Sequence, residues 1–201
     1  MNTQLIIKII KQIAQMIEQK ADILTELDRL IGDGDHGINL KRGFDAVMVN
    51  INEFKQKSSK ELLNYVAMTL MSKVGGSSGP FLGTIFLKLA QSDNFAQGIL
   101  QAADAVQMRG KANVGDKTMV DILTPFASTY NQLLTQGVNQ NQALDRAIEK
   151  AKEHLDESKN LIARKGRASY LGERSLGVTD PGSQSTYYML EIVVKELKQN
   201  D

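Results

Sequence analysis

Three aspartates and three glycines fall within the ten residues from Asp28 to Gly37, a stretch that reads DRLIGDGDHG. Glycine carries no Cβ atom, so this backbone can turn tightly and approach a ligand closely. Asp33 and Asp35, two residues apart on an extended loop, can point the same way and form a cup of carboxylate oxygens. Mg²⁺ prefers such ligands and commonly bridges protein carboxylates to substrate phosphates. The stretch predicts a magnesium and polyphosphate site, although an acidic, glycine-rich surface turn has the same composition.

Two other motifs overlap this stretch, and both fail. Gly32, Gly34 and Gly37 have the spacing of the dinucleotide-binding fingerprint. That loop offers backbone N–H groups to bare pyrophosphate, which the aspartates here would repel, and the flanking βαβ pattern is missing. Read as an EF-hand loop beginning at Asp33, the chain has Phe44 where the bidentate glutamate belongs. We therefore exclude both a dinucleotide-binding fold and a calcium sensor.

The composition excludes several classes of protein. The 201 residues carry 24 basic and 23 acidic side chains, which leaves no electrostatic footprint for nucleic acid or an anionic membrane. There is no cysteine, so disulfides and thiolate metal sites are excluded, and two histidines alone cannot make a typical zinc site. The sequence shows neither a secretory pattern nor an apolar run long enough to span a membrane. We expect one cytoplasmic domain over residues 1–201, with neither nucleic acid nor membrane as a partner.

Apolar residues recur at helical spacing in eight stripes along the chain. The stripes cover residues 5–17, 40–51, 62–74, 81–89, 94–108, 119–134, 142–162 and 187–197. Ser58 and Glu61 form a capping box that opens the third helix. Pro80 is a favourable first residue for the fourth, and Gly166 ends the seventh. Eight helices with mostly short connections favour an all-α, antiparallel up-and-down barrel or bundle.

In such an array, the connections after the first, third, fifth and seventh helices all lie at one end. The chemically distinctive stretches fall in these four connections, and they are residues 28–37, 75–80, 109–119 and 164–183. The second contains two serines just before a helix start, where exposed N–H groups and the helix dipole attract phosphate. It fits the pattern of a nucleophile elbow but lacks the preceding strand. Singly, the second stretch could be a plain connector and the cationic stretch 164–174 a solvated loop, but four unrelated loops would not all choose one end.

These four stretches, in this order, resemble the motifs of one family: the nucleotide-binding L subunits of bacterial dihydroxyacetone kinases that depend on the phosphotransferase system. The matching segments are LIGDGDHG from Leu30, GGSSGP from Gly75, GKA from Gly110 with GDKTM from Gly115, and DPGS from Asp180. The resemblance covers the whole chain, and four ordered motifs together are highly specific.

The resemblance implies an eight-helix barrel that holds ADP at one rim through two Mg²⁺ ions. The implied metal ligands are Asp28, Asp33 and Asp35. The implied contacts with the nucleotide come from His36, Gly37, Ile38, Asn39, Ser77, Ser78, Gly110, Thr118, Met119, Arg167, Asp180, Pro181 and Gly182. Three carboxylates and a diphosphate carry about six negative charges, so two ions are reasonable. We expect Arg167 to be the catalytic cation of the rim, with Lys165 and Arg174 as competing candidates.

The resemblance also implies partners. In the family, a phosphoryl carrier of the phosphoenolpyruvate phosphotransferase system phosphorylates the bound ADP, so that ATP is the phosphorylated intermediate, and a separate K subunit holds dihydroxyacetone. Two alternatives use the same rim. One is the nucleotide domain of an ATP-dependent dihydroxyacetone kinase or of a fatty acid kinase, and the other is a nucleotide-sensing partner of a regulator. The length of 201 residues favours the subunit, because the ATP-dependent kinases are far longer.

Overall fold

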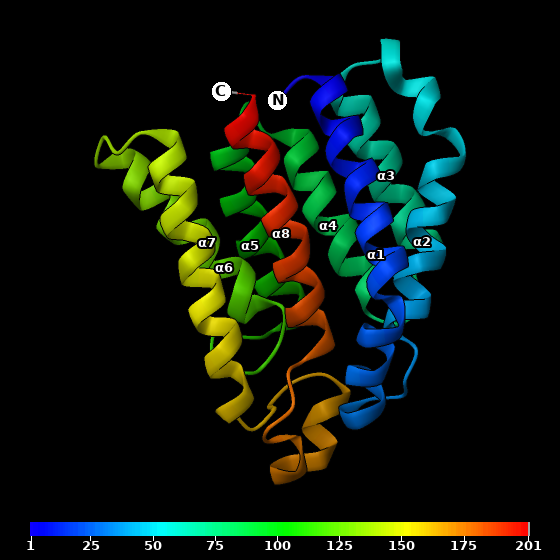
Figure 1. The fold of residues 1–201 in the computed structure, drawn as a ribbon, viewed down its shortest axis with the longest axis vertical. Coiled ribbons are helices and arrows are strands. Elements are labelled where there is room, and N and C mark those ends of the chain that lie inside the picture. The colour runs from blue at the N-terminus through cyan, green and yellow to red at the C-terminus, as the bar shows by residue number, and fades with distance from the viewer. Residues whose placement is uncertain (201) are drawn as a thin grey trace.

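The computed structural model describes residues 1–200, and in this part of the chain the regular structure is entirely helical (Figure 1). The α-helices are α1 (Thr3–Ile31), α2 (His36–Asn50), α3 (Ser59–Lys73), α4 (Ser78–Gln91), α5 (Phe95–Gly110), α6 (Val120–Thr135), α7 (Gln140–Glu157) and α8 (Pro181–Gln199). Three 3-10 segments are η1 (Ile51–Gln56), η2 (Ser158–Asn160) and η3 (Arg167–Ser175). None of the helices in residues 1–200 combines the length and the apolar character needed to cross a bilayer.

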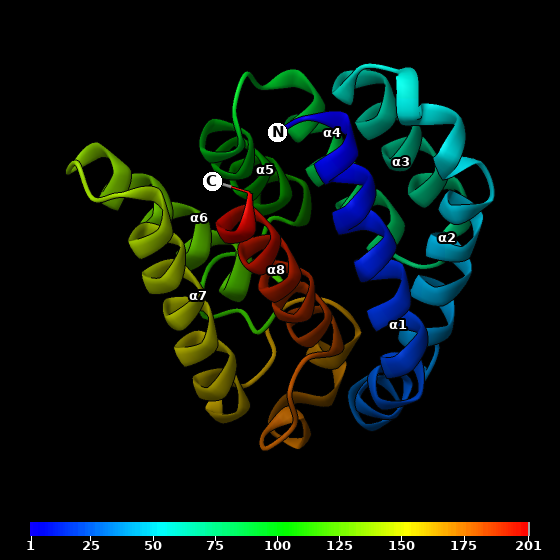
Figure 2. The same ribbon diagram turned by 45° about the horizontal axis from the view of Figure 1, so that its top comes forward.

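The eight α-helices form a closed ring. Each packs against the helix before it and the helix after it, and α8 returns between α7 and α1 (Figure 2). Across the seam between α1 and α8, the Lys8 ammonium lies 2.7 Å from the buried carboxylate of Glu196, and the Gln12 amide donates to that carboxylate at 2.6 Å. Successive helices run in opposite directions. The predicted all-α, antiparallel up-and-down barrel of eight helices is confirmed.

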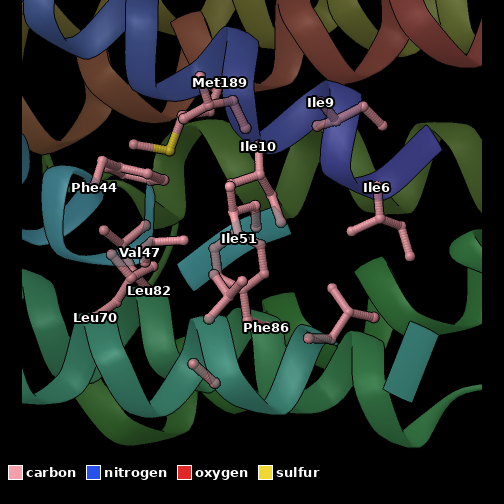
Figure 3. Packing of buried hydrophobic residues seen from close by; sticks show 14 of the residues in the cluster. Ile6, Ile9, Ile10, Phe44, Val47, Ile51, Leu70, Leu82, Phe86 and Met189 are labelled. Atoms are coloured by element: carbon pink, nitrogen blue, oxygen red, sulfur yellow. The ribbon is translucent and has the colours of Figure 1, made fainter. Parts of the chain in front are cut away.

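Buried apolar side chains fill the ring as two clusters. The first joins α1 to α4 and includes Ile10, Phe44 and Leu70, and Met189 of α8 reaches into it (Figure 3). The second lies among α5 to α8 around Phe126. Fully burying a side chain of this size contributes about 1.5–3 kcal/mol, so these stripes hold the ring together. Because α8 contributes to both clusters, the last helix joins the two halves of the ring.

Two predicted boundaries near the first connection and the fourth helix are wrong. No helix breaker stands between the first predicted stripe and Gly32, so α1 continues to Ile31 and Asp28 lies on a helix, not on a loop. Helix α4 begins at Ser78, which makes Pro80 its third residue and not its first. The capping box of Ser58 is confirmed, because its side chain accepts from a first-turn amide while the glutamate carboxylate accepts from the Ser58 amide.

The last connection differs most from the prediction. Helix α7 ends at Glu157, and the chain then turns through η2, so Ile162 is not helical and Gly166 does not end this helix. The predicted cationic loop contains the 3-10 segment η3. Helix α8 begins at Pro181, well before its apolar stripe, because the Asp180 side chain caps it.

Candidate functional site

The four chemically distinctive stretches lie at the lower end of the ring in Figure 1. A cavity of about 280 Å³ opens among them. The predicted site residues that line it are Asp28, Asp33, Asp35, His36, Asn39, Ser77, Ser78, Gly110, Thr118, Met119, Arg167, Asp180, Pro181 and Gly182. Sequence positions from all four connections are thus brought to one place.

Two predicted residues, Gly37 and Ile38, do not line the cavity. Gly37 packs against α1 so closely that an added Cβ would lie 1.9 Å from the carbonyl oxygen of Ala21, and the Ile38 side chain points out and is 57% exposed. Both belong to the first turn of α2, where backbone N–H groups have no acceptor within the helix. Only their amides are placed to serve the site.

Three carboxylates form an acidic cluster at the mouth of the cavity. One oxygen from each of Asp28, Asp33 and Asp35 lies within 4.8 Å of the others. The buried Asp28 also shapes the loop, since its Oδ2 accepts from the backbone amides of Asp35 at 2.8 Å and His36 at 3.1 Å. Gly32 is required here, because a Cβ at that position would lie 2.0 Å from Oδ1 of Asp28. Such an all-oxygen donor set suits a hard divalent cation such as Mg²⁺.

Four helix N-termini converge on the same end. Because the ring is antiparallel, α2, α4, α6 and α8 all begin here and direct the positive ends of their dipoles towards the cavity. Ser77 and Ser78 add hydroxyl groups at the start of α4. The preceding Gly75 allows the chain to pass close to α2, since a Cβ there would lie 2.7 Å from Oδ1 of Asn39. A cluster of helix starts favours an anionic group such as phosphate.

His36 connects three of the helices. Its Nε2 lies 3.0 Å from the hydroxyl of Ser185 on α8, and its Nδ1 lies 3.2 Å from the hydroxyl of Ser78 on α4. Burial lowers the pKa of His36 below its ordinary value, and the carboxylates of Asp28 and Asp35 oppose that shift. The neutral imidazole of His36 therefore positions the hydroxyl groups of Ser78 and Ser185 by hydrogen bonds.

The connection between α5 and α6 is organised by two buried aspartates. Asp121 accepts from the amides of Gly115 at 2.6 Å and Thr118 at 2.7 Å, while Asp116 accepts from the amide of Asn113 at 2.8 Å. Burial raises the pKa of Asp121, and the hydrogen bonds from these amides oppose the shift. These hydrogen bonds shape the wall that presents Thr118 and its neighbour Met119 to the cavity.

The last connection supplies two cations, Arg167 and Lys165, and one acid, Asp180, to the cavity. The Arg167 guanidinium lies 3.0 Å from the carboxylate of Asp33. Asp180 accepts from the amide of Ser183 at 2.7 Å and so caps α8. Burial raises the pKa of Asp180 to about 6, against the effect of that hydrogen bond, and the nearby carboxylates of Asp121 and Asp28 add to the rise. Of the competing cations, Lys165 lines the cavity and Arg174 does not.

Several lining residues were not predicted from the sequence to contact the nucleotide or the metal. They are Ile31, Gly75, Gly76, Phe81, Val106, Ala112, Val120, Lys165, Gly166 and Ala168. The two glycines at 75 and 76 stood inside a recognised motif, and Lys165 stood in the cationic stretch. The apolar members lie near helix ends, where their spacing looks the same as that of core residues. They give the cavity an apolar wall beside its charged mouth.

Comparisons with known proteins agree with this geometry. The family model described as the DAK2 domain matches residues 30–195. The ADP-binding subunit DhaL of the PEP-dependent dihydroxyacetone kinase of Escherichia coli (strain K12) is 39% identical over 189 residues, which cover 90% of this chain and 90% of that protein. Its counterpart from the PTS-dependent kinase of Lactococcus lactis subsp. lactis (strain IL1403) is 41% identical over 185 residues, which cover 90% and 91%.

The fold is also found in solved structures. The native dihydroxyacetone kinase of C. freundii matches with a TM-score of 0.75 at 24% identity, over 96% of this chain and 34% of that one. A complex of the same kinase with AMP-PNP and Mg²⁺ matches with a TM-score of 0.74 at 23% identity. The chain therefore corresponds to about a third of that kinase. The resemblance seen in the four motifs is confirmed, and with a family model that spans most of its length this chain belongs to the DAK2 domain family.

Proposed function

We propose that this chain is the ADP-binding subunit of a phosphoenolpyruvate-dependent dihydroxyacetone kinase, a phosphotransferase. The observation that carries the proposal is the meeting of three carboxylates and four helix N-termini at one cavity, in a chain that matches such subunits over 90% of its length. In this proposal residues 1–201 act as one nucleotide-binding helical domain in the cytoplasm. Neither nucleic acid nor a membrane is a partner.

Asp28, Asp33 and Asp35 are the proposed ligands of Mg²⁺. Their oxygens lie close enough together to share a cation, and carboxylates this close repel one another without one. We propose two ions, because one divalent charge does not balance three carboxylates and a diphosphate. Bound there, Mg²⁺ would neutralise the phosphates beside these carboxylates.

The phosphates of ADP would lie at the starts of α2 and α4. The amides of Gly37 and Ile38 and the side chain of Asn39 serve them from α2, and the hydroxyls of Ser77 and Ser78 serve them from α4. His36 orients the second of these hydroxyls. This arrangement supplies hydrogen-bond donors together with positive helix ends, which is the requirement for binding a polyphosphate.

The nucleoside would occupy the apolar side of the cavity. Gly110, Thr118 and Met119 line this part of the cavity, together with Asp180, Pro181 and Gly182. Gly182 lies beside Met119, since a Cβ added to this glycine would be 4.0 Å from the Met119 Cβ. The ring of Phe81 lies against Gly110, since a Cβ added to this glycine would be 3.3 Å from the ring. A flat apolar base fits beside an aromatic ring and a residue without a side chain.

Arg167 is the proposed catalytic cation. Its guanidinium lies at the carboxylate cluster, and its side chain is 67% exposed at the open mouth of the cavity. Phosphoryl transfer depends on positioning and on neutralising charge at the moving group. A guanidinium at the mouth can hold the terminal phosphate where a second protein reaches it.

The partners in this proposal are a dihydroxyacetone-binding K subunit and a phosphoryl carrier of the phosphotransferase system. Each would approach the cavity mouth in turn, since the nucleotide passes a phosphoryl group from one to the other. Large apolar side chains are exposed on the elements that meet at this end of the ring, and they include Leu30 (62% exposed), Ile38 (57%) and Tyr170 (90%). Exposed apolar side chains beside a charged site support docking of other proteins there.

The test is reconstitution from phosphoenolpyruvate. This chain, loaded with ADP and Mg²⁺, is combined with the phosphotransferase components, the carrier and a K subunit, and dihydroxyacetone phosphate is measured. The proposal expects product only when all components are present. Product from free ATP without the carrier would instead support the ATP-dependent kinase domain, and nucleotide binding without any transfer would support the sensing role.

A further inference from the structure

The side chain of Lys117 is buried to 0% exposure, and the proposed nucleotide contacts do not use it. Its ammonium donates to two backbone carbonyls, that of Leu161 at 2.9 Å and that of Ser175 at 2.6 Å. Burying a cation is unfavourable unless its donors are satisfied, and burial lowers the pKa of Lys117. The negative charge of Asp180 opposes that shift, and the groups that the ammonium holds directly are the two carbonyls.

The two carbonyls lie at the two ends of one loop, residues 161–175, which we name the Arg167 loop. Just outside the loop, the two flanking segments are joined by the amide of Gly177, which donates to the carbonyl of Lys159 at 2.8 Å. Within the loop, the Ser175 hydroxyl accepts from the amide of Ala163 at 2.9 Å. Lys117 therefore contacts the point where the chain enters and leaves the loop that carries Arg167.

Lys117 belongs to a different connection, the one that lines the nucleoside side of the cavity. Its backbone φ is +63°, an unfavourable value for a residue with a side chain. The hydrogen bonds from the Thr118 and Gly115 amides to Asp121 hold this conformation. A second link runs from the amide of Arg164 to the carbonyl of Asp116 at 3.1 Å. The wall of the cavity and the Arg167 loop are thus joined, with the ammonium at the joint.

We propose that Lys117 is the positioning residue for Arg167: it fixes both ends of the Arg167 loop to the cavity wall, so that the guanidinium stays beside Asp33. Lys117 acts only through this loop and touches neither the nucleotide nor the metal ligands. The inference rests on the proposed role of Arg167 at the phosphates. Its structural half, the fixing of the loop, does not depend on that role.

The first experiment is hydrogen exchange of Lys117→Met in the full chain without nucleotide. Methionine keeps the length and apolar stem and removes the donors. Amides of residues 161–177 should exchange about tenfold faster, while those of α1 to α6 keep wild-type rates. The control is Lys111→Met, because Lys111 lies in the same connection with φ of +47° but is exposed. Unchanged protection of the loop in Lys117→Met would overturn the proposal.

The second experiment separates positioning from general stability, using the reconstituted system and calorimetry with ADP and Mg²⁺. Lys117→Met should lower turnover about tenfold while nucleotide affinity stays within about threefold. The double variant Lys117→Met with Arg167→Ala should lose no more turnover than Arg167→Ala alone, because both changes remove the same function of Arg167. Lys117→Arg should restore part of the turnover. The positioning role would be contradicted if the losses of turnover from the two single changes multiplied in the double variant. It would also be contradicted if Lys117→Met lost nucleotide affinity and turnover equally.

Two further outcomes need a separate reading: wild-type protein that transfers no phosphoryl group, and a Lys117→Met variant that does not fold. If wild-type protein binds ADP but transfers nothing, the proposed function fails, and hydrogen exchange still decides whether Lys117 fixes the loop. If Lys117→Met does not fold, Ser175→Ala tests the same joint, because its hydroxyl links the two ends of the loop. That variant should lose turnover with unchanged affinity, and wild-type turnover with wild-type exchange would overturn the proposal.

Discussion

At the scale of single residues, the three aspartates of the acidic cluster differ in burial and therefore in their role. Asp28 is 8% exposed, and its carboxylate accepts hydrogen bonds from the backbone amides of Asp35 and His36. The fold of the first connection therefore depends on this residue. Asp33 and Asp35 make no comparable backbone contacts as acceptors and lie nearer solvent. The spacing paired Asp33 with Asp35, and the family resemblance implied Asp28 as a third ligand. Neither could separate these roles, because Asp28 was taken as part of a loop.

Asp33→Asn and Asp35→Asn should leave the fold intact and abolish Mg²⁺-dependent ADP binding. A neutral amide is a weak ligand for a hard cation, and neither side chain is deeply buried. Calorimetry with ADP and Mg²⁺ measures binding, and thermal unfolding checks the fold. Asp22→Asn is the control, since Asp22 is an exposed carboxylate on α1, the helix before this loop, and does not line the cavity. Unchanged ADP affinity in both site variants would remove the aspartates from the metal site.

Asp180→Asn should change the pH dependence of stability in metal-free protein. Because burial raises the pKa of Asp180 from 3.8 to about 6, the folded state binds more protons than the unfolded state between these values. Its contribution to the free energy of unfolding is therefore fully present below pH 3.8 and is lost as pH rises through 6. Asparagine also caps helices, so the variant should gain stability relative to wild type between pH 4 and pH 8, by on the order of 3 kcal/mol. Urea unfolding at both pH values measures this, and an equal difference at both would contradict it.

At the scale of elements, periodicity predicted where helices lie but not where they end. The stripes of α2, α3, α5 and α6 were recognised because buried and exposed positions alternate with helical spacing. The prediction for α7 ran too far, because Ile162 continued the apolar spacing after the helix had stopped. The Arg167 loop was read only as a cationic stretch, since part of its order comes from hydrogen bonds with Lys117, which is distant in the sequence.

Ser58→Ala should lower the free energy of unfolding by about 1 kcal/mol without changing ADP affinity. The Ser58 hydroxyl accepts from the Glu61 amide at 3.2 Å, and the Glu61 carboxylate accepts from the Ser58 amide at 2.9 Å. This cap lies between α2 and α3, at the end of the ring away from the cavity. Ser58→Gly is the matched control, because glycine caps almost as well and should cost only a few tenths. A loss of ADP affinity in Ser58→Ala would show that the two ends of the ring are coupled.

At the scale of the whole molecule, topology decides where chemistry occurs. In an antiparallel ring every second connection lies at the same end, and this placed residues from all four motifs around one cavity. The number and order of the helices were enough to predict that these four connections share one end. The apolar wall with Phe81 could not be predicted, because it depends on how the start of α4 packs against the end of α5, where the Phe81 ring meets Gly110.

A ligand held by such a cavity should stabilise the entire ring, because its contacts come from both halves of the chain. With Mg²⁺ present, ADP at 100 times its dissociation constant should add roughly 2.7 kcal/mol to the free energy of unfolding. No thermal shift at saturating ADP and Mg²⁺ would contradict a nucleotide site. Mg²⁺ alone is the control, and it should shift unfolding less.

The same geometry predicts that ADP behaves as a retained cofactor and not as a product exchanged in each cycle. In the proposed site, the metal ligands, the helix starts and the apolar wall would enclose the nucleotide, and the exposed Arg167 would face the partners. The purified protein should keep ADP through desalting, be inactive with dihydroxyacetone alone, and become active only with both the carrier and the K subunit. Chromatography of the released nucleotide and assays with each component omitted measure this. A protein that loses ADP at once and uses free ATP without partners would have to be an ATP-dependent kinase domain, because an exchanged nucleotide needs no second protein to recharge it.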